Sequence, residues 1–131
     1  MRILIITAFF LFTQITDVFA QKRLWALVMS KGLGYTQQAW RTRTNFPEKE
    51  INELWAEGYQ ITSLNYAEMR WALVMSKGSG YTKQKWFNGE TFPADDIKKG
   101  WDESYSITHV TYGNNRWVVV MSKGSNLGMQ A

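Results

Sequence analysis

The octapeptide Trp-Ala-Leu-Val-Met-Ser-Lys-Gly stands at residues 71–78, and the sequence contains it a second time at residues 25–32. A near copy, Trp-Val-Val-Val-Met-Ser-Lys-Gly, follows at residues 117–124. Successive copies begin 46 residues apart, and residues 24–69 match residues 70–115 at 22 of 46 positions without a gap. Self-similarity at a fixed period of this size is the signature of a repeat architecture. We therefore predict repeat units at residues 24–69, 70–115 and 116–131, of which the last is partial.

The octapeptide predicts a strand that is buried on both faces. Trp71, Leu73 and Met75 fall on one side of an extended chain, and the residues between them, which are also largely apolar, fall on the other side. Such a strand belongs in the centre of a sheet. Residues 106–112 are rich in aromatic and β-branched residues and lead into Gly113-Asn114-Asn115, which suits a tight hairpin. We expect residues 106–112 and 116–122 to pair as antiparallel neighbours.

The residues after the octapeptide predict a loop, a third strand and a helix. Lys77-Gly78-Ser79-Gly80 favours a hairpin into a strand at residues 81–87. A phosphate-binding loop is disfavoured because the lysine precedes the glycines and no GxxxxGK[ST] string is present. Phe-Pro at residues 92–93 is followed by acidic residues and by Ile97 and Trp101 four residues apart, which predicts one short helix.

These elements together predict an α+β fold. Each unit is expected to be a three-stranded antiparallel meander followed by one short helix, giving seven strands and two helices after residue 20. One unit cannot bury both faces of its Trp-bearing strand, so adjacent units should pack into a single compact repeat domain. A propeller-like closure and an open stack are both compatible with the pattern.

The aromatic residues follow the 46-residue period. All seven Trp and all six Tyr sit at matching places, and so do Phe46 and Phe92. A large side chain that is duplicated with its unit is best explained by core packing, with a ligand-stacking platform as the alternative. The Trp positions are 25, 40, 55, 71, 86, 101 and 117.

The composition argues against an enzyme. The chain of 131 residues has no Cys and one His, which excludes a disulfide framework, a thiol nucleophile and a thiolate metal site. His109 is replaced by Ser63 in the first unit, so no mechanism shared by the units depends on it. The recurrent serines at positions 30, 76 and 122 cannot each pair with one His, and strand-end hydrogen bonding explains them better. We predict no catalytic, metal or cofactor site.

The first twenty residues predict a signal peptide. Arg2 is followed by an apolar run over residues 3–12, which is too short to cross a bilayer as a helix, and the segment ends with Val18 and Ala20. We expect cleavage after Ala20, secretion or periplasmic localisation of residues 21–131, and no stable membrane insertion afterwards. A buried N-terminal element and a retained membrane anchor are the alternatives.

Residues 23–125 resemble a known family. The string Arg-Trp-x-x-Val-Met-Ser-Lys-Gly-x-Gly-Tyr-Thr-x-Gln, the Phe-Pro helix with its Trp and the Tyr-x-Ile-Thr strand are similar to a Trp-rich repeat domain of unknown function. That domain is found C-terminal to plant casein-kinase-I-like kinases and in bacterial proteins with caspase-like peptidase domains. The resemblance implies an accessory, non-catalytic module and assigns no catalytic residues.

Three classes of function remain open. The leading class is a protein-interaction module, the second is a lectin-like carbohydrate-binding module with a Trp facing outward beside a Gln, and an enzyme is the least favoured. The candidate binding-surface residues have a structural alternative, namely turn hydration and cross-strand hydrogen bonding. These candidates are Lys31, Lys77, Lys123, Gln38, Gln84, Trp40 and Trp86.

The expected partners are a protein or a glycan. A net charge of +4 and the export signal argue against nucleic acid. Because the last unit is incomplete, we expect an open sheet edge beside residues 117–121, which could pair with another copy of the chain. Coverage of that edge by the first strand is the alternative.

Overall fold

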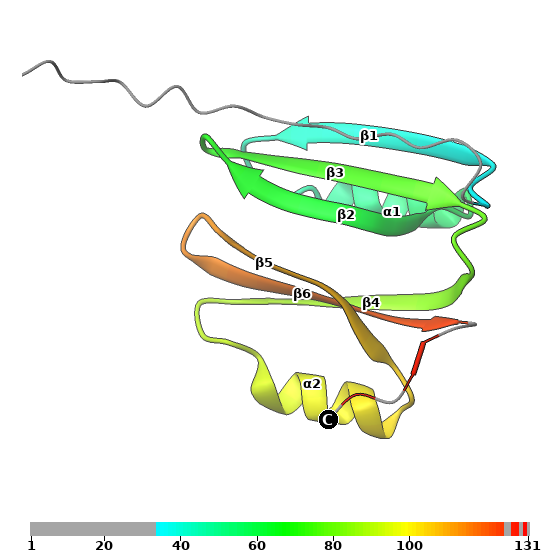
Figure 1. Ribbon diagram of the computed structural model, residues 1–131. Helices are drawn as coiled ribbons and strands as arrows, with labels where there is room; N and C mark the ends of the chain where they lie inside the picture. Colours follow the sequence, from blue (N-terminus) through cyan, green and yellow to red (C-terminus); the bar gives the residue numbers. More distant parts are fainter. Residues whose placement is uncertain (1–33, 125–126, 129, 131) are drawn as a thin grey trace, which may run out of the picture.

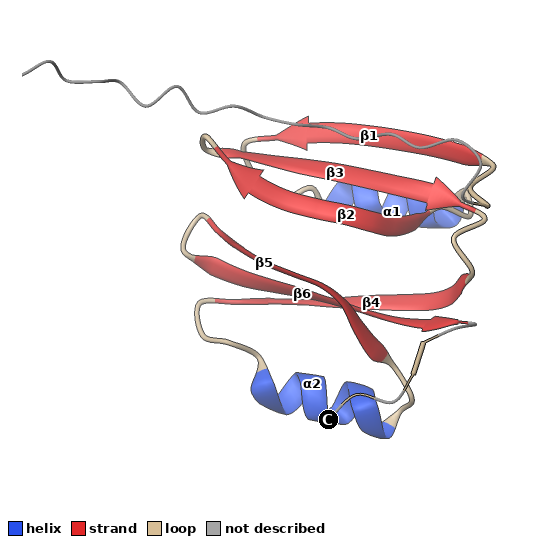
Figure 2. Ribbon diagram, in the orientation of Figure 1, coloured by secondary structure: helices blue, strands red, loops and turns tan. Residues whose placement is uncertain are grey.

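Two three-stranded antiparallel sheets and two helices make up the computed structural model, which describes residues 34–124, 127–128 and 130 (Figure 1). Sheet A has the strand order β1-β3-β2 and sheet B has the order β4-β6-β5 (Figure 2). The α+β class is confirmed, and neither sheet closes into a barrel. In chain order the elements are β1 (Gln37–Arg43), α1 (Glu48–Ala56), β2 (Gln60–Ala67), β3 (Arg70–Lys77), β4 (Tyr81–Gly89), α2 (Ala94–Asp102), β5 (Ser106–Gly113) and β6 (Arg116–Gly124).

The octapeptides form the central strands, as predicted. The copy at residues 71–78 lies in β3 except for its last residue, Gly78, and the copy at residues 117–124 lies in β6. Each of these strands is flanked on both sides. The copy at residues 25–32 lies outside the described residues. The expected hairpin between β5 and β6 is confirmed, with Asn114 and Asn115 both at positive φ. Glu68 and Met69, between β2 and β3, are likewise both at positive φ, in a turn that has neither Gly nor Asn.

The predicted three-stranded meander is wrong. The strand after the glycine loop, β4, pairs with β6 and not with β3, whose second neighbour is β1. Gly78 and Gly80, at φ +74° and +81°, turn the chain out of sheet A instead of closing a hairpin. A Cβ on Gly78 would lie 2.5 Å from the carbonyl oxygen of Gly34, so this close backbone contact requires glycine.

The helices serve as crossover connections within each sheet. Strands β1 and β2 flank β3 and both run antiparallel to it, so they run parallel to each other and need a long connection, which α1 supplies. Both helices carry acidic residues in the first turn, as predicted. Each begins directly after a proline, and Pro47 and Pro93 are the N-cap residues rather than the first helical residues. Helix α2 is nine residues long, as α1 is, although it contains Gly100. A Cβ added at Gly100 would lie 2.4 Å from Sδ of Met121.

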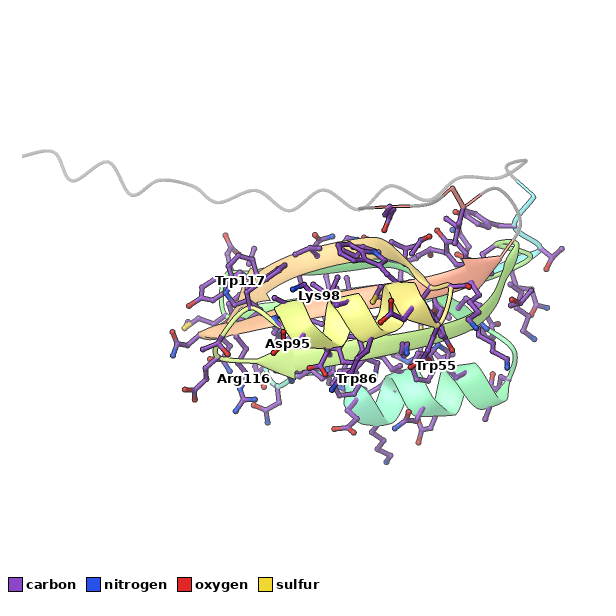
Figure 3. All side chains as sticks on the ribbon, turned by 90° about the horizontal axis from the view of Figure 1, so that it is seen from below. Trp55, Trp86, Asp95, Lys98, Arg116 and Trp117 are labelled. Carbon is purple, nitrogen blue, oxygen red and sulfur yellow. The ribbon has the colours of Figure 1, made fainter. Side chains whose placement is uncertain are left out.

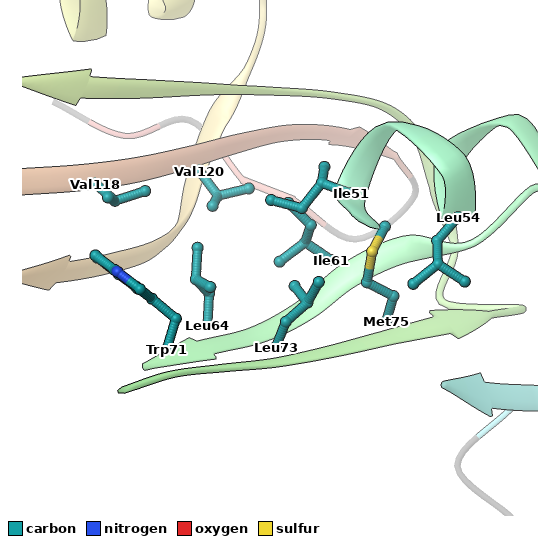
Figure 4. Packing of buried hydrophobic residues seen from close by; sticks show 9 residues of the cluster. All are labelled: Ile51, Leu54, Ile61, Leu64, Trp71, Leu73, Met75, Val118 and Val120. Atoms are coloured by element: carbon teal, nitrogen blue, oxygen red, sulfur yellow. The ribbon is translucent and has the colours of Figure 1, made fainter. Parts of the chain in front are cut away.

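The two sheets and their helices form a stack in which β6 is buried on both faces. Val118 and Val120 pack into the cluster that α1 makes with sheet A (Figure 4). Val119 and Met121 point to the other face, where they pack against Ile97 of α2. These four residues, Val118, Val119, Val120 and Met121, are each 0% exposed. The first cluster contains Ile51, Leu54, Ile61, Leu64, Trp71, Leu73, Met75, Val118 and Val120.

Core packing explains most of the described Trp residues. Trp71 is buried, and Trp55, Trp86 and Trp101 are partly buried against the two clusters. Trp117 packs against the rings of Phe92 and Tyr112, at centroid distances of 5.3 and 5.1 Å. Trp40 differs, because 52% of it is exposed. Trp25 lies outside the described residues.

Close approach of β2 and β5 makes Gly113 sensitive to substitution. A Cβ at this position would lie 2.2 Å from Cβ of Tyr66, a rigid part of that side chain. We expect Gly113→Ala to lower the free energy of unfolding by about 1–3 kcal/mol, the usual cost of overpacking. Urea denaturation measures the change. Gly128→Ala is the matched control, because a Cβ there has nothing within 4 Å. Equal stability of the two variants would contradict the described packing.

Candidate functional site

A Gln, a Ser and a Thr form the same polar network in both sheets. In sheet B, Nε2 of Gln84 donates to Oγ of Ser122 at 2.9 Å, and the hydroxyls of Ser122 and Thr108 are 2.7 Å apart. In sheet A the matching distances, for Gln38 to Ser76 and for Ser76 to Thr62, are 3.2 and 2.9 Å. Ser76 and Ser122 are fully buried. The predicted hydrogen-bonding role of these two serines is confirmed, and Ser30 lies outside the described residues.

A β-bulge brings the threonines into this network. The pairing register shifts between residues 61 and 63 on β2, and between residues 107 and 109 on β5. The extra residue at each bulge is the threonine, whose hydroxyl lies within hydrogen-bonding distance of the buried serine on the central strand.

Gln84 also holds the two sheets together. Its Oε1 accepts from the backbone N–H of Ile61 at 2.6 Å and from Nε1 of Trp55 at 3.2 Å, while its Nε2 donates to the carbonyl of Ile61 at 2.8 Å. This side chain therefore pairs with the backbone of β2 as a strand residue would. Both ends of its amide are engaged within the protein, so its cross-strand hydrogen bonds occupy the groups that a ligand would need.

Gln130 makes the same contact one period later. Its Oε1 accepts from the N–H of Ile107 at 2.5 Å, and its Nε2 donates to the carbonyl of Ile107 at 3.0 Å. Gln130 lies 46 residues after Gln84, and Ile107 lies 46 residues after Ile61. Sequence reasoning missed this residue, and its spacing from Gln84 was the signal that could have found it.

The two described candidate lysines, one in each sheet, lie over tyrosine rings. Nζ of Lys77 is 4.7 Å from the ring centroid of Tyr59, and Nζ of Lys123 is 4.5 Å from that of Tyr105. Lys85 shares the second ring at 4.2 Å and also binds Glu103 at 2.7 Å. This hydrogen bond from Lys85 lowers the pKa of the Glu103 carboxyl. Lys31 lies outside the described residues.

The candidate tryptophans occupy different environments. Trp86 packs against Phe46 with ring centroids 4.7 Å apart, so it belongs to the contact between the sheets. Trp40 pairs in register with Val74 and lies on the side of sheet A that faces away from sheet B. It stands beside an open groove of about 610 Å3 lined by residues 38–43. We call this side the Trp40 face, which comprises Gln38, Trp40, Ala72 and Val74. Trp40 thus faces outward beside a Gln, whereas Trp86 does not.

A second exposed apolar surface lies at the opposite end of the stack, next to α2. Phe92, Val110 and Tyr112 are 47%, 42% and 51% exposed, and the rings of Phe92 and Tyr112 pack around Trp117. Trp117 lies near the first turn of α2 (Figure 3). We call these four residues the aromatic surface. The sequence analysis did not single them out as a surface, because their counterparts 46 residues earlier, Phe46, Leu64, Tyr66 and Trp71, look equivalent in sequence but are covered by sheet B.

His109 joins β5 to β2. Its Nε2 lies against the carbonyl oxygen of Leu64 and 3.4 Å from the N–H of the same residue. Burial lowers the pKa of this imidazole, and the backbone hydrogen bond to Leu64 raises it by less. The position of His109 is therefore explained by the contact between the sheets.

Within residues 34–124, 127–128 and 130, no three His, Asp or Glu side chains come together as possible metal ligands. Neither described helix is long and apolar enough to span a membrane.

The fold and these surfaces define an α+β domain. The chain belongs to the family described as Domain of unknown function (DUF7477), whose model matches residues 13–131. No curated protein and no solved structure matches the chain. The match begins at Thr13, before the predicted cleavage after Ala20, and Gln14-Ile15-Thr16 repeats Gln60-Ile61-Thr62 at an offset of 46 residues.

The two glutamines provide a matched test of the contact between the sheets. Gln84→Ala removes hydrogen bonds to Ile61, Trp55 and Ser122, so we expect the free energy of unfolding to fall by about 1–3 kcal/mol. Gln38→Ala removes only the bond to Ser76, and we expect a loss of about 0.5–1.5 kcal/mol. Urea denaturation of both variants measures the difference. A loss in Gln38→Ala as large as that in Gln84→Ala would contradict the assigned role.

Proposed function

We propose that this protein is an exported, non-catalytic interaction module that binds a protein partner through its aromatic surface. The observation that carries the proposal is the exposure of Phe92, Val110 and Tyr112 around Trp117. The counterparts of these residues in the first half of the chain are already covered by sheet B, so the same arrangement of side chains is suited to contact with protein.

The chemistry of the aromatic surface supports a protein partner. Exposed apolar residues that lie together, as distinct from single ones, mark interaction sites. Tyr, Trp and Phe are enriched in the buried centres of protein interfaces, because they bury a large area at a low cost in side-chain entropy. The nearby Arg116 keeps its guanidinium at the surface, 3.3 Å from Asn88, and can contribute a polar rim.

A non-catalytic role is supported by the residues that could otherwise carry chemistry. His109 is engaged with Leu64, and the hydroxyls of Ser76 and Ser122 are buried against threonine and glutamine side chains. The resemblance to an accessory repeat domain points in the same direction.

Export is supported by the pattern of the first twenty residues. We expect expression of the full chain to release a product into the medium or periplasm whose mass corresponds to a chain beginning at Gln21, because Val18 and Ala20 suit signal peptidase. Mass spectrometry of the released protein measures its N-terminus. Deletion of residues 3–12, the apolar run, is expected to retain the protein in the cell. Recovery of the protein only from the cytoplasm with residues 1–20 intact would contradict the proposal.

The partner is tested by affinity capture from the compartment that contains the protein, with quantitative mass spectrometry. We expect Val110→Glu to lose the captured protein, because it places a charge within the aromatic surface. Asn52→Lys on α1 is the control, because it is exposed and its counterpart 46 residues later is Lys98. Capture that is equal for both variants would place the interaction elsewhere.

A carbohydrate is the second candidate ligand, and one observation favours it. Trp40 is 52% exposed beside the open groove along β1, as expected of a ring that stacks on a sugar. On a glycan array this candidate is supported by binding that Trp40→Ala removes and Val110→Glu leaves unchanged. No glycan binding would eliminate it and leave the protein-partner proposal in place.

A further inference from the structure

A group of basic side chains lies on the face of sheet B that carries α2 and turns away from sheet A (Figure 1). Nζ of Lys85 is 4.2 Å and Nζ of Lys123 is 4.5 Å from the ring centroid of Tyr105. Lys83 stands directly opposite Lys123 in the pairing of β4 with β6, and residues in register share one face of a sheet. The three lysines therefore gather beside one ring. We call Lys83, Lys85, Lys123 and Tyr105 the cationic site.

A single carboxylate in the described part of the chain balances these three ammonium groups. Glu103 binds Lys85 at 2.7 Å, and this hydrogen bond, together with the charges of Lys85 and Lys123, lowers the pKa of its carboxyl. Lys83 and Lys123 form no ion pair with any described residue. Like charges that face each other on neighbouring strands destabilise a sheet. The cationic site therefore holds an excess of positive charge at a cost in stability.

The equivalent place in sheet A is built without this excess of charge. At an offset of 46 residues, Gln37 replaces Lys83 and Ala39 replaces Lys85. Gln37 faces Lys77, the counterpart of Lys123, so no two cations oppose each other there. The two additional lysines are consequently not a requirement of the repeated fold.

The tyrosine hydroxyls of the two sheets differ in the same way. In sheet A the hydroxyl of Tyr59 donates to Oε1 of Gln37 at 3.2 Å. In sheet B the matching position is Lys83, whose ammonium group donates hydrogen bonds and accepts none. The hydroxyl of Tyr105 has no hydrogen-bond partner among the residues that the structure describes. An oxygen of a bound anion can therefore take the place that Oε1 of Gln37 has in sheet A.

Packing against α2 holds Lys85 in position. Cε of Lys85 lies 4.0 Å from the place of an added Cβ on Gly100, where α1 has Leu54. The side chain of Lys85 is only 25% exposed, and its ammonium group is fixed between the Glu103 carboxylate and the Tyr105 ring. A donor that is already held in place loses little side-chain entropy when it binds a ligand.

We propose that the cationic site binds a tetrahedral oxyanion, namely a sulfate or phosphate group. Lysine ammonium groups act as point charges that donate in several directions, whereas a planar carboxylate is matched best by the fork of an arginine, which this site lacks. A tetrahedral anion also offers enough oxygens for several lysines and the Tyr105 hydroxyl. The site lies six residues along β6 from Trp117, about 20 Å in an extended strand, so it is separate from the aromatic surface and goes beyond the proposed function.

NMR titration of the protein purified after expression of the full chain tests the proposal. Sodium sulfate and sodium phosphate are the probes, and sodium chloride and sodium acetate at the same ionic strength are the controls. We expect sulfate, phosphate or both to give saturable shifts at the cationic site with a Kd of about 1–20 mM. The anion that binds more tightly identifies the group. Neither chloride nor acetate is expected to reproduce these shifts.

Variants of the site should change the Kd in opposite directions. Lys83→Gln restores the residue of the first half and is expected to weaken binding about two- to fivefold, as for an exposed ion pair. Lys85→Met keeps the packed stem without the charge and should weaken binding about tenfold. Glu103→Gln removes the competing carboxylate and should tighten binding about two- to fivefold. Lys98→Asn is the control of equal charge, because Lys98 is exposed on α2 and its counterpart is Asn52.

Three results would overturn the proposal: no saturable shifts with either anion, equal binding of acetate, or a loss of affinity in Lys98→Asn as large as that in Lys83→Gln. Thermal unfolding followed by circular dichroism should show that every variant is folded. Val110→Glu is expected to bind the anion like the wild type, because it alters only the aromatic surface. Loss of anion binding in the lysine variants and loss of protein capture in Val110→Glu are therefore separate results, and either proposal can fail without the other.

Discussion

The central strand of each sheet carries apolar side chains on both faces, and the whole arrangement follows from the need to cover them. In β6 the four residues from Val118 to Met121 are fully buried, two against the first half of the chain and two against α2. A helix on one face is not enough, because burial of each apolar side chain contributes about 1.5–3 kcal/mol and half of that contribution would be lost with one face in water. The neighbouring half of the molecule must therefore cover the second face.

Polar groups make this stacking specific. Hydrophobic burial is non-directional and would tolerate several positions of one sheet against the other. Gln84 fixes one of them, because its amide pairs with both backbone groups of Ile61 and so sets the position of β4 relative to β2. The close contact of Gly113 on β5 with Tyr66 sets the separation of the sheets at the other end of β2. A buried amide that lost its partners would be costly, which penalises other arrangements.

Local patterns predicted the elements well and their connections poorly. The alternation around Trp71 and Trp117, the turn at Asn114 and the prolines before the helices each depend on neighbouring residues, and each led to the correct element. Whether β4 pairs with β3 or with β6 depends on the backbone contact of Gly78 with Gly34, which periodicity does not report. The pairing of β4 with β6 also removes the open edge that was expected beside residues 117–121, because β6 is flanked by β4 and β5.

The candidate surface was predicted only in part, because residues that are equivalent in sequence differ in what covers them. Trp40 and Trp86 cannot be distinguished by spacing, yet one is exposed and the other packs against Phe46. The same holds for Val110 and Leu64. Gln130 was missed because little else in residues 125–131 follows the repeat.

The glycines at the ends of the strands constrain how this protein can change during evolution. Gly124 approaches Gly80 as Gly78 approaches Gly34, with the carbonyl oxygen 2.3 Å and 2.5 Å from the position of an added Cβ. An insertion inside Lys-Gly-x-Gly would separate these backbones, whereas extra residues beside the exposed Thr44 and Asn45 would lengthen the loop before α1 at the surface. Duplication or loss of the whole period between Gly34 and Gly80 would still place a glycine opposite Gly124. Sequence length in such a lineage is therefore expected to vary in whole periods, with smaller changes confined to the loops that precede the helices.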